Sequence, residues 1–123
     1  MSIDVLERWG TDLLTALVAL ERNGVMHRDI KPANLGVYQS SSRADSHLVI
    51  FDFSMAGVDP KNIEAGTPPY LDPFLGTGGR RQYDTAAERY GAAVVLFEMA
   101  TGKSPGTGPT RTPTRPPSMT TSR

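Results

Sequence analysis

The sequence of 123 residues contains no cysteine and only two histidines. Without cysteine there is no disulfide, no thiol nucleophile and no Cys-ligated zinc, and two histidines are too few for a His-rich metal site. No apolar run approaches the ~18 residues that a membrane span needs. The thirteen Lys and Arg are balanced by thirteen Asp and Glu, which disfavours a dedicated nucleic-acid binder. The N-terminus has no basic segment typical of a secretory signal. We therefore expect a cytoplasmic protein with no nucleic-acid or membrane partner.

The composition changes sharply near the C-terminus. Sixteen of the twenty residues 104–123 are Thr, Pro, Ser or Gly. Such a segment buries too little apolar surface to offset the entropy of its chain, which predicts disorder. We divide the chain into a foldable part, residues 1–103, and a disordered Thr/Pro-rich tail, residues 104–123.

Apolar residues at spacings of three and four predict a first helix over residues 3–22. Ser2 or Asp4 can cap its start, and Asn23 with Gly24 supplies a left-handed stop. Its apolar face consists of Leu6, Trp9, Leu13, Leu17 and Leu20, widened by Leu14 and Val18.

A second helix is predicted over residues 85–100, ended by Gly102. Its stretch 92–97 is apolar all round, which is typical of a buried helix. One side of this helix carries Ala86, Tyr90, Val94 and Phe97.

Between the helices, residues 35–38 and 48–51 have β-like composition and flank a polar connection of nine residues. We interpret them as an antiparallel hairpin. Residues 54–79 contain too many Gly and Pro for regular structure and predict a long ordered loop. The neighbouring pair Arg80 and Arg81 is expected on a solvated loop face.

The predicted hairpin brings two polar residues together. Asn34 precedes the first strand and Asp52 follows the second, so both lie at the open end of the hairpin. Amide and carboxylate oxygens suit Mg²⁺, which takes oxygen ligands and keeps several waters. Asp29 and Lys31 lie in the same short loop as Asn34. A carboxylate, an ammonium and a metal site in one loop are typical of phosphoryl transfer.

Four motifs resemble those of protein kinases, in the expected order. Residues 27–34 read His-Arg-Asp-Ile-Lys-Pro-Ala-Asn, which resembles the kinase catalytic loop H-R-D-x-x-x-x-N. Residues 52–54, Asp-Phe-Ser, resemble the metal-binding D-F-G with its glycine replaced. Residues 66–74 resemble the end of an activation segment, and residues 83–102 resemble the large buried helix of the kinase C-lobe.

The resemblance implies roles for individual residues. Asp29 accepts the proton of the substrate hydroxyl, and Lys31, which is typical of serine/threonine kinases, lies near the transferred phosphate of ATP. Asn34 and Asp52 hold Mg²⁺. Thr67 hydrogen-bonds Asp29 and Lys31. The implied cofactors are ATP and Mg²⁺, and the implied partner is a protein substrate with a Ser or Thr hydroxyl.

The resemblance also implies roles in holding the site together. His27 packs beneath the catalytic loop and ties it to Phe53. Glu88 stands where a kinase has Asp, and its carboxylate receives the amides of the catalytic loop. Phe74 replaces the glutamate of A-P-E, which removes an ion pair with a downstream arginine.

The resemblance covers residues 3–102 and only the C-lobe of a kinase. No Gly-rich loop and no ATP-holding strand lysine occur in the 123 residues. The expected fold is therefore an α+β fragment, mainly helical with a short β-hairpin. Its nearest likeness is to the large kinase of phage-growth-limitation (BREX-type) defence systems. We expect a serine/threonine protein kinase by descent, inactive as an isolated chain. The alternative is a non-catalytic, pseudokinase-like module that binds partners.

The segment that follows the D-F-S motif lacks a phosphate acceptor. Many kinases with an arginine before the catalytic aspartate need a phosphorylated activation loop to order it. Here that arginine is Arg28, and residues 55–66 contain no Ser, Thr or Tyr. We hypothesise that Glu64, or else Asp59, pairs with Arg28 permanently; a solvated Glu64 is the alternative.

Overall fold

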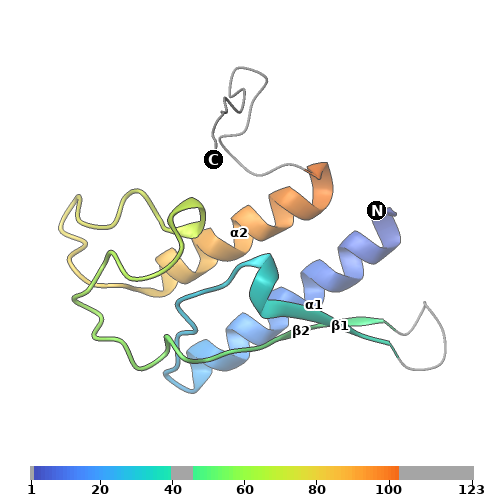
Figure 1. The fold of residues 1–123 in the computed structure, drawn as a ribbon, viewed down its shortest axis with the longest axis horizontal. Coiled ribbons are helices and arrows are strands. Elements are labelled where there is room, and N and C mark those ends of the chain that lie inside the picture. Colours follow the sequence, from blue (N-terminus) through green and yellow to red (C-terminus); the bar gives the residue numbers. More distant parts are fainter. Residues whose placement is uncertain (1, 40–45, 103–123) are drawn as a thin grey trace, which may run out of the picture.

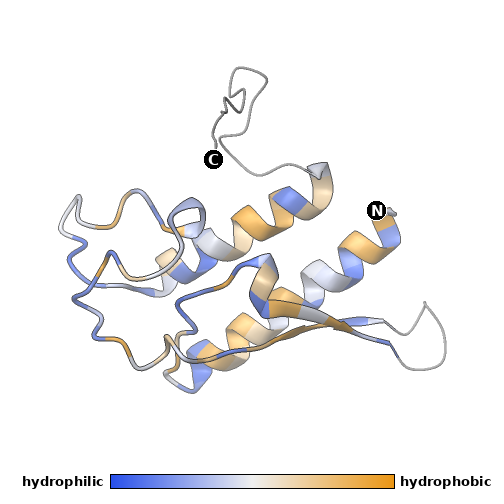
Figure 2. Cartoon of the chain, viewed as in Figure 1, coloured by the Kyte–Doolittle hydropathy of each residue, from blue (hydrophilic) through white to orange (hydrophobic). Residues whose placement is uncertain are grey.

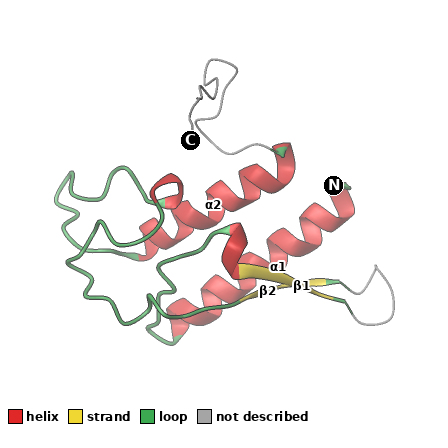
Figure 3. Ribbon diagram, in the orientation of Figure 1, coloured by secondary structure: helices red, strands yellow, loops and turns green. Residues whose placement is uncertain are grey.

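The computed structural model describes residues 2–39 and 46–102. Helix α1 spans Ile3–Arg22, strands β1 and β2 span Leu35–Tyr38 and His47–Ile50, and helix α2 spans Thr85–Thr101. Short 3₁₀ helices lie at Pro32–Asn34 and Pro68–Tyr70. The two long helices run in opposite directions beside the hairpin, and the long loop after β2 gathers at one end (Figures 1 and 3).

This arrangement confirms the predicted α+β class, with two helices and one two-stranded antiparallel sheet. The predicted disordered tail, residues 104–123, lies outside the described residues. In the described part of the chain, no helix has the length and apolar character needed to cross a membrane.

The ends of both helices follow from local sequence. The Ser2 hydroxyl accepts a hydrogen bond from the Val5 amide at 3.2 Å, and α1 ends at the predicted Asn23 cap. The Asp84 carboxylate accepts from the Ala87 amide at 2.9 Å and so caps α2. Gly102 ends α2 with a left-handed φ of 72°, a conformation that glycine adopts without strain.

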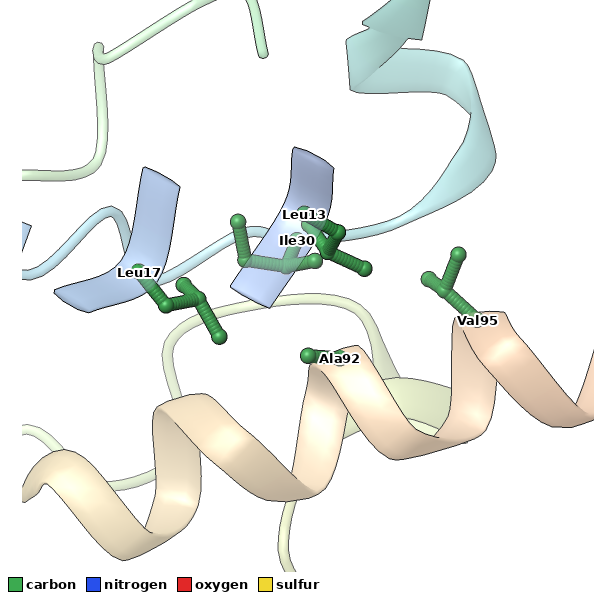
Figure 4. Packing of buried hydrophobic residues seen from close by; sticks show 5 residues of the cluster. All are labelled: Leu13, Leu17, Ile30, Ala92 and Val95. Atoms are coloured by element: carbon green, nitrogen blue, oxygen red, sulfur yellow. The ribbon is translucent and has the colours of Figure 1, made fainter. Parts of the chain in front are cut away.

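A small apolar core joins the two helices and the segment around Ile30. Leu13 and Leu17 of α1 meet Ala92 and Val95 of α2, with Ile30 between them (Figure 4). Apolar residues recur along α1, α2 and the hairpin (Figure 2). Partly buried apolar residues of the hairpin cover this core: Leu35, Leu48 and Ile50.

The predicted helix faces are partly wrong. Leu14 and Val18 are 48% and 44% exposed, so the buried stripe of α1 is narrower than predicted. In α2, Phe97 is 46% exposed, whereas Glu88 is 1% exposed. Helix α2 turns this acidic residue inward because its carboxylate meets buried backbone amides, an interaction that hydrophobic periodicity does not reveal.

The hairpin is real, but its second strand starts one residue earlier than predicted. Leu35 pairs with Ile50 and Tyr38 pairs with His47, so eight residues rather than nine connect the strands. Strand β2 ends at Ile50 because Asp52 takes a left-handed φ of 60°. The Phe51 amide still donates to the Asn34 carbonyl at 2.7 Å.

Polar contacts fix the start of β2 on helix α1. The indole Nε1 of Trp9 donates to the Ser46 hydroxyl at 3.2 Å. The Asp12 carboxylate accepts from the Leu48 amide at 2.9 Å and contacts the His47 ring at 3.1 Å. The hairpin is therefore held at this end by hydrogen bonds as well as by its apolar face.

One arginine closes the loop that precedes α2. Arg80 donates to the Asp72 carboxylate at 2.8 Å and to both oxygens of the Asp84 carboxylate at 2.7 and 2.9 Å. Asp72 is 8% exposed. The expectation that Arg80 is solvated is therefore wrong, whereas Arg81 is exposed. Because Asp84 also caps α2, this bridge ties the end of the loop to the start of the helix.

We predict that Arg80→Ala lowers the thermal unfolding midpoint of the chain, because it leaves the buried Asp72 carboxylate without its guanidinium partner. Arg81→Ala is the matched control, since it removes the same side chain one residue away at an exposed site. Circular dichroism at neutral pH measures both midpoints. Equal midpoints for the two variants would contradict a structural role for Arg80.

The contact between Arg80 and Asp84 also makes the stability of the chain depend on pH. Hydrogen bonds from Arg80 hold the pKa of Asp84 below its usual 3.8. Stabilisation from the ionised Asp84 is therefore present above pH 3.8 and is lost as the pH falls through the lower folded-state pKa. The difference in midpoint between wild type and Arg80→Ala should shrink in that acidic range.

Candidate active site

A buried carboxylate at the first turn of α2 holds the start of residues 27–34, the segment that resembles a kinase catalytic loop and is called by that name below. The two oxygens of Glu88 accept hydrogen bonds from the backbone amides of His27 and Arg28. The Tyr83 hydroxyl donates a third bond to Glu88, at 2.7 Å. Arg28 has a left-handed φ of 74°; such a turn points successive amides at one anion. The role expected for Glu88 agrees with these contacts.

His27 links the catalytic loop to the end of β2. Its Nδ1 accepts from the Asp29 amide at 3.1 Å, so the ring proton lies on Nε2, which donates to the Phe51 carbonyl at 2.7 Å. The ring also meets Phe53 edge-on at 4.7 Å between centroids. His27 is 0% exposed, so it joins the two loops, as expected from the resemblance.

Asp29, Lys31 and Thr67 form one hydrogen-bonded cluster. The Thr67 hydroxyl donates to Asp29 Oδ1 at 3.0 Å, and the Lys31 ammonium donates to the Thr67 hydroxyl at 2.8 Å. Lys31 Nζ lies 3.6 Å from Asp29 Oδ2. Thr67 comes from a loop 38 residues further along the chain than Asp29. The structure therefore assembles the three predicted residues in one place.

The backbone before Thr67 requires glycine. Gly66 has a φ of 131°, a conformation that L-residues rarely adopt. A Cβ at this position would lie 2.8 Å from a methyl of Leu71 and 3.5 Å from the Arg28 carbonyl. This close approach turns the chain so that the Thr67 side chain reaches Asp29.

Asn34 adjoins this cluster. Its amide nitrogen donates to the Asp29 carbonyl at 2.8 Å and to Asp29 Oδ2 at 3.2 Å. The amide therefore presents its oxygen, rather than its nitrogen, to any cation that Asn34 binds. Asn34 is 8% exposed, and these two hydrogen bonds fix the orientation of its side-chain amide.

Asp52 follows Phe51, whose backbone amide donates to the Asn34 carbonyl at 2.7 Å. Hydrogen bonds from Ser54 are the main cause that holds the pKa of the Asp52 carboxyl below 3.8, and the charge of Lys31 lowers it further. An anionic oxygen at Asp52 and an amide oxygen at Asn34 fit a hard divalent cation. In residues 2–39 and 46–102, no group of three His, Asp or Glu could hold a metal by itself. A cation here would take its other oxygens from water or a ligand, as Mg²⁺ does.

Two contacts at the site were not predicted from the sequence. The Tyr83 ring lies 4.4 Å from the guanidinium carbon of Arg28 while its hydroxyl binds Glu88. The Phe51 ring lies against Gly36, where a Cβ would come within 2.3 Å of a ring carbon. Spacing along the chain gives no signal for either contact, because both depend on how the loop folds back. The glycine in an otherwise apolar strand was the one available hint of a close approach.

Comparisons with known proteins agree with this geometry. The protein kinase domain family matches residues 1–118. "Probable kinase PglW" of Streptomyces coelicolor is 46% identical over 108 residues, covering 88% of this chain and 7% of that protein. The serine/threonine-protein kinase PkaA of the same organism is 35% identical over 96 residues, covering 73% and 17%. The Arabidopsis thaliana kinase AtPK1/AtPK6 is 30% identical over 109 residues, covering 85% and 22%.

The chain therefore belongs to the protein kinase domain family. Its relatives include bacterial and plant serine/threonine kinases. It spans less than a quarter of the length of each of these three proteins.

We predict that Glu88→Gln lowers the free energy of unfolding by about 3 kcal/mol, because its amide turns one acceptor into a donor facing a buried N–H. Denaturant titration measures this change. Glu7→Gln makes the same replacement at an exposed position of α1 and serves as the control. Equal stabilities of wild type and Glu88→Gln would contradict the role of this carboxylate in holding the catalytic loop.

Proposed function

We propose that the chain carries the substrate- and metal-facing side of a serine/threonine protein kinase active site. The observation that carries the proposal is the cluster around Asp29. One carboxylate oxygen accepts from the Thr67 hydroxyl at 3.0 Å, and the other lies 3.2 Å from the Asn34 amide nitrogen and 3.6 Å from Lys31. An ionised carboxylate fixed beside a cationic side chain suits transfer of a phosphoryl group to a hydroxyl.

Each residue of the cluster has a distinct task. With MgATP bound, Asp29 would accept the proton of a serine or threonine hydroxyl as that oxygen bonds to the γ-phosphorus and the bond from phosphorus to the departing ADP oxygen breaks. Lys31 places positive charge where negative charge develops during transfer. Thr67 holds both side chains in register from the other side of the site. The partly buried setting, with Asp29 17% and Lys31 26% exposed, strengthens these charge interactions.

Asn34 and Asp52 are the residues that would hold Mg²⁺. MgATP, when bound, supplies the transferred phosphoryl group together with neutralisation of its charge. Asn34 is oriented by its bonds to Asp29, and hydrogen bonds from Ser54 lower the pKa of the Asp52 carboxyl. Asn34 would therefore present its amide oxygen to the cation while its amide nitrogen stays bonded to Asp29.

We propose further that these residues are the C-lobe part of such a kinase. The segments that cover the nucleotide in the kinase family, the Gly-rich loop and the strand lysine, do not occur among the 123 residues. Positioning of both reactants supplies most of the rate of phosphoryl transfer. The 123-residue chain by itself is therefore inactive. Its 46% identity to the Streptomyces protein PglW supports descent from the large kinase of phage-growth-limitation defence systems.

We predict that the chain binds ATP weakly, with a dissociation constant on the order of 1 mM, and only when Mg²⁺ is present. Asn34→Ala and Asp52→Ala should each remove the dependence on Mg²⁺, because each removes one oxygen ligand. Isothermal calorimetry with and without Mg²⁺ measures this. Asn62→Ala, at an exposed position of the same lobe, should leave binding unchanged.

Two outcomes would contradict the proposal. Micromolar binding that survives the double change Asn34→Ala and Asp52→Ala would refute the assignment of the ligands. Complete absence of Mg²⁺-dependent binding at millimolar ATP would favour the alternative, a partner-binding module without nucleotide chemistry.

Transfer of labelled phosphate to a generic Ser/Thr substrate should stay at background. Transfer that Asp29→Asn abolishes would support Asp29 while overturning the inactivity of the chain.

A further inference from the structure

Arg28 makes an unusual set of contacts next to the candidate active site. It is 3% exposed. Its guanidinium donates to the backbone carbonyls of Val58, Asp59 and Asn62 at 3.0, 2.9 and 2.6 Å. The same guanidinium lies over the Tyr83 ring, with its carbon 4.4 Å from the ring centroid. One buried arginine thus holds three carbonyls of the loop after β2.

The hypothesis that Glu64 pairs with Arg28 is wrong. Glu64 is exposed, and no ion pair in the described part of the chain joins it to Arg28. Asp59 contacts Arg28 through its backbone carbonyl, while its carboxylate accepts from the Lys61 amide at 2.9 Å. The arginine therefore orders this loop without any side-chain anion.

We propose that Arg28 is a positioning residue that fixes residues 58–62 against the catalytic loop through backbone carbonyls, so that ordering of this segment needs no phosphate. The proposal rests on the proposed kinase function, because it names how the same site is regulated. Residues 55–66 contain no Ser, Thr or Tyr, so no residue of this stretch can receive a phosphate on a hydroxyl. The carbonyls take the place of a modification for which residues 55–66 offer no acceptor.

The chemistry of the contacts favours arginine alone. A guanidinium presents several donors in one plane, which lets it reach three carbonyls while its face stacks on an aromatic ring. The ammonium of lysine is a single point and cannot span them. Hydrogen bonds from a charged donor are stronger than neutral ones. We call the three bonds from the Arg28 guanidinium to the carbonyls of residues 58–62 the clamp. The clamp is also tied to α2, because the Tyr83 hydroxyl donates to the Glu88 carboxylate that binds the Arg28 amide.

The clamp lies close enough to the catalytic cluster to affect it. Arg28 directly precedes Asp29, and its carbonyl lies near Gly66, where a Cβ would come within 3.5 Å. Thr67 follows Gly66 and donates to Asp29. Residues 58–62 and Gly66 therefore both contact Arg28, the former through its guanidinium and the latter through its carbonyl. We expect loss of the first contact to disturb the second, and with it the bond from Thr67 to Asp29.

Hydrogen exchange measured by NMR tests the proposal on the 123-residue chain. The chain is first treated with phosphatase and shown by intact mass to carry no phosphate. The amides of Val58 and Asn62, which donate to the carbonyls of Met55 and Asp59, report on the segment. They should exchange slowly in this phosphate-free chain. In Arg28→Lys they should exchange about tenfold faster, consistent with the loss of roughly one charge-assisted hydrogen bond.

Matched measurements separate positioning from general stability. Amides of α1 and α2 should change less than about twofold in Arg28→Lys, and the Thr67 methyl resonance should broaden as its hydrogen bond to Asp29 loosens. Glu64→Gln is the control and should leave both the exchange rates and the Thr67 resonance unchanged.

Three results would overturn the proposal. The first is rapid exchange of Val58 and Asn62 in the phosphate-free wild type. The second is protection that appears only after inorganic phosphate is added, which would make Arg28 an anion receptor. The third is unchanged exchange in Arg28→Lys. If Arg28→Lys does not fold, the wild-type measurements with and without phosphate still decide between these outcomes. None of them requires nucleotide, so this proposal and the kinase function can fail separately.

Discussion

The buried carboxylate of Glu88 is the contact on which the rest of the site depends. It is 1% exposed and accepts from two consecutive amides and one tyrosine hydroxyl. A buried anion is tolerated only when its oxygens are fully hydrogen-bonded. The need to satisfy it fixes α2 against the catalytic loop and forces Arg28 into a left-handed turn. From that turn, the guanidinium of Arg28 donates to carbonyls of residues 58–62, and the carboxylate of Asp29 accepts from the Thr67 hydroxyl.

The sequence predicts the helices well because their signals are local. Periodic leucines, the Ser2 cap and the glycine stops are each read within a few residues, and α1 and α2 end within one residue of the prediction. The prediction placed β2 one residue too far along the chain, because alternation alone does not show where Asp52 breaks the strand. Leu14 and Val18 were wrongly placed in the core for a similar reason. A periodic pattern shows that a face is apolar, but it does not show how much of it finds a neighbour.

The residues of the candidate site also divide into those that a local motif predicts and those whose partners no local pattern reveals. Asp29, Lys31, Asn34, Asp52 and Thr67 were predicted from motifs, and the structure brings the first three and Thr67 into one hydrogen-bonded cluster. The partners of Arg28 and Arg80 were not predicted correctly. Arg28 binds carbonyls, which every residue carries and which therefore leave no trace in the sequence. Arg80 binds Asp72 and Asp84, whereas it was expected on a solvated loop face.

The hairpin is held near both of its ends by hydrogen bonds. At one end Asn34 and Phe51 are joined by a backbone bond beside the site, and at the other Ser46 and Leu48 are joined to side chains of α1. The length of the connection between β1 and β2 is thereby uncoupled from the geometry at Asp52. Lengthening a connection costs little, since closure entropy grows only slowly with loop length. A longer segment between Tyr38 and His47 should therefore leave the other end of the hairpin, where the Phe51 amide donates to the Asn34 carbonyl, in register.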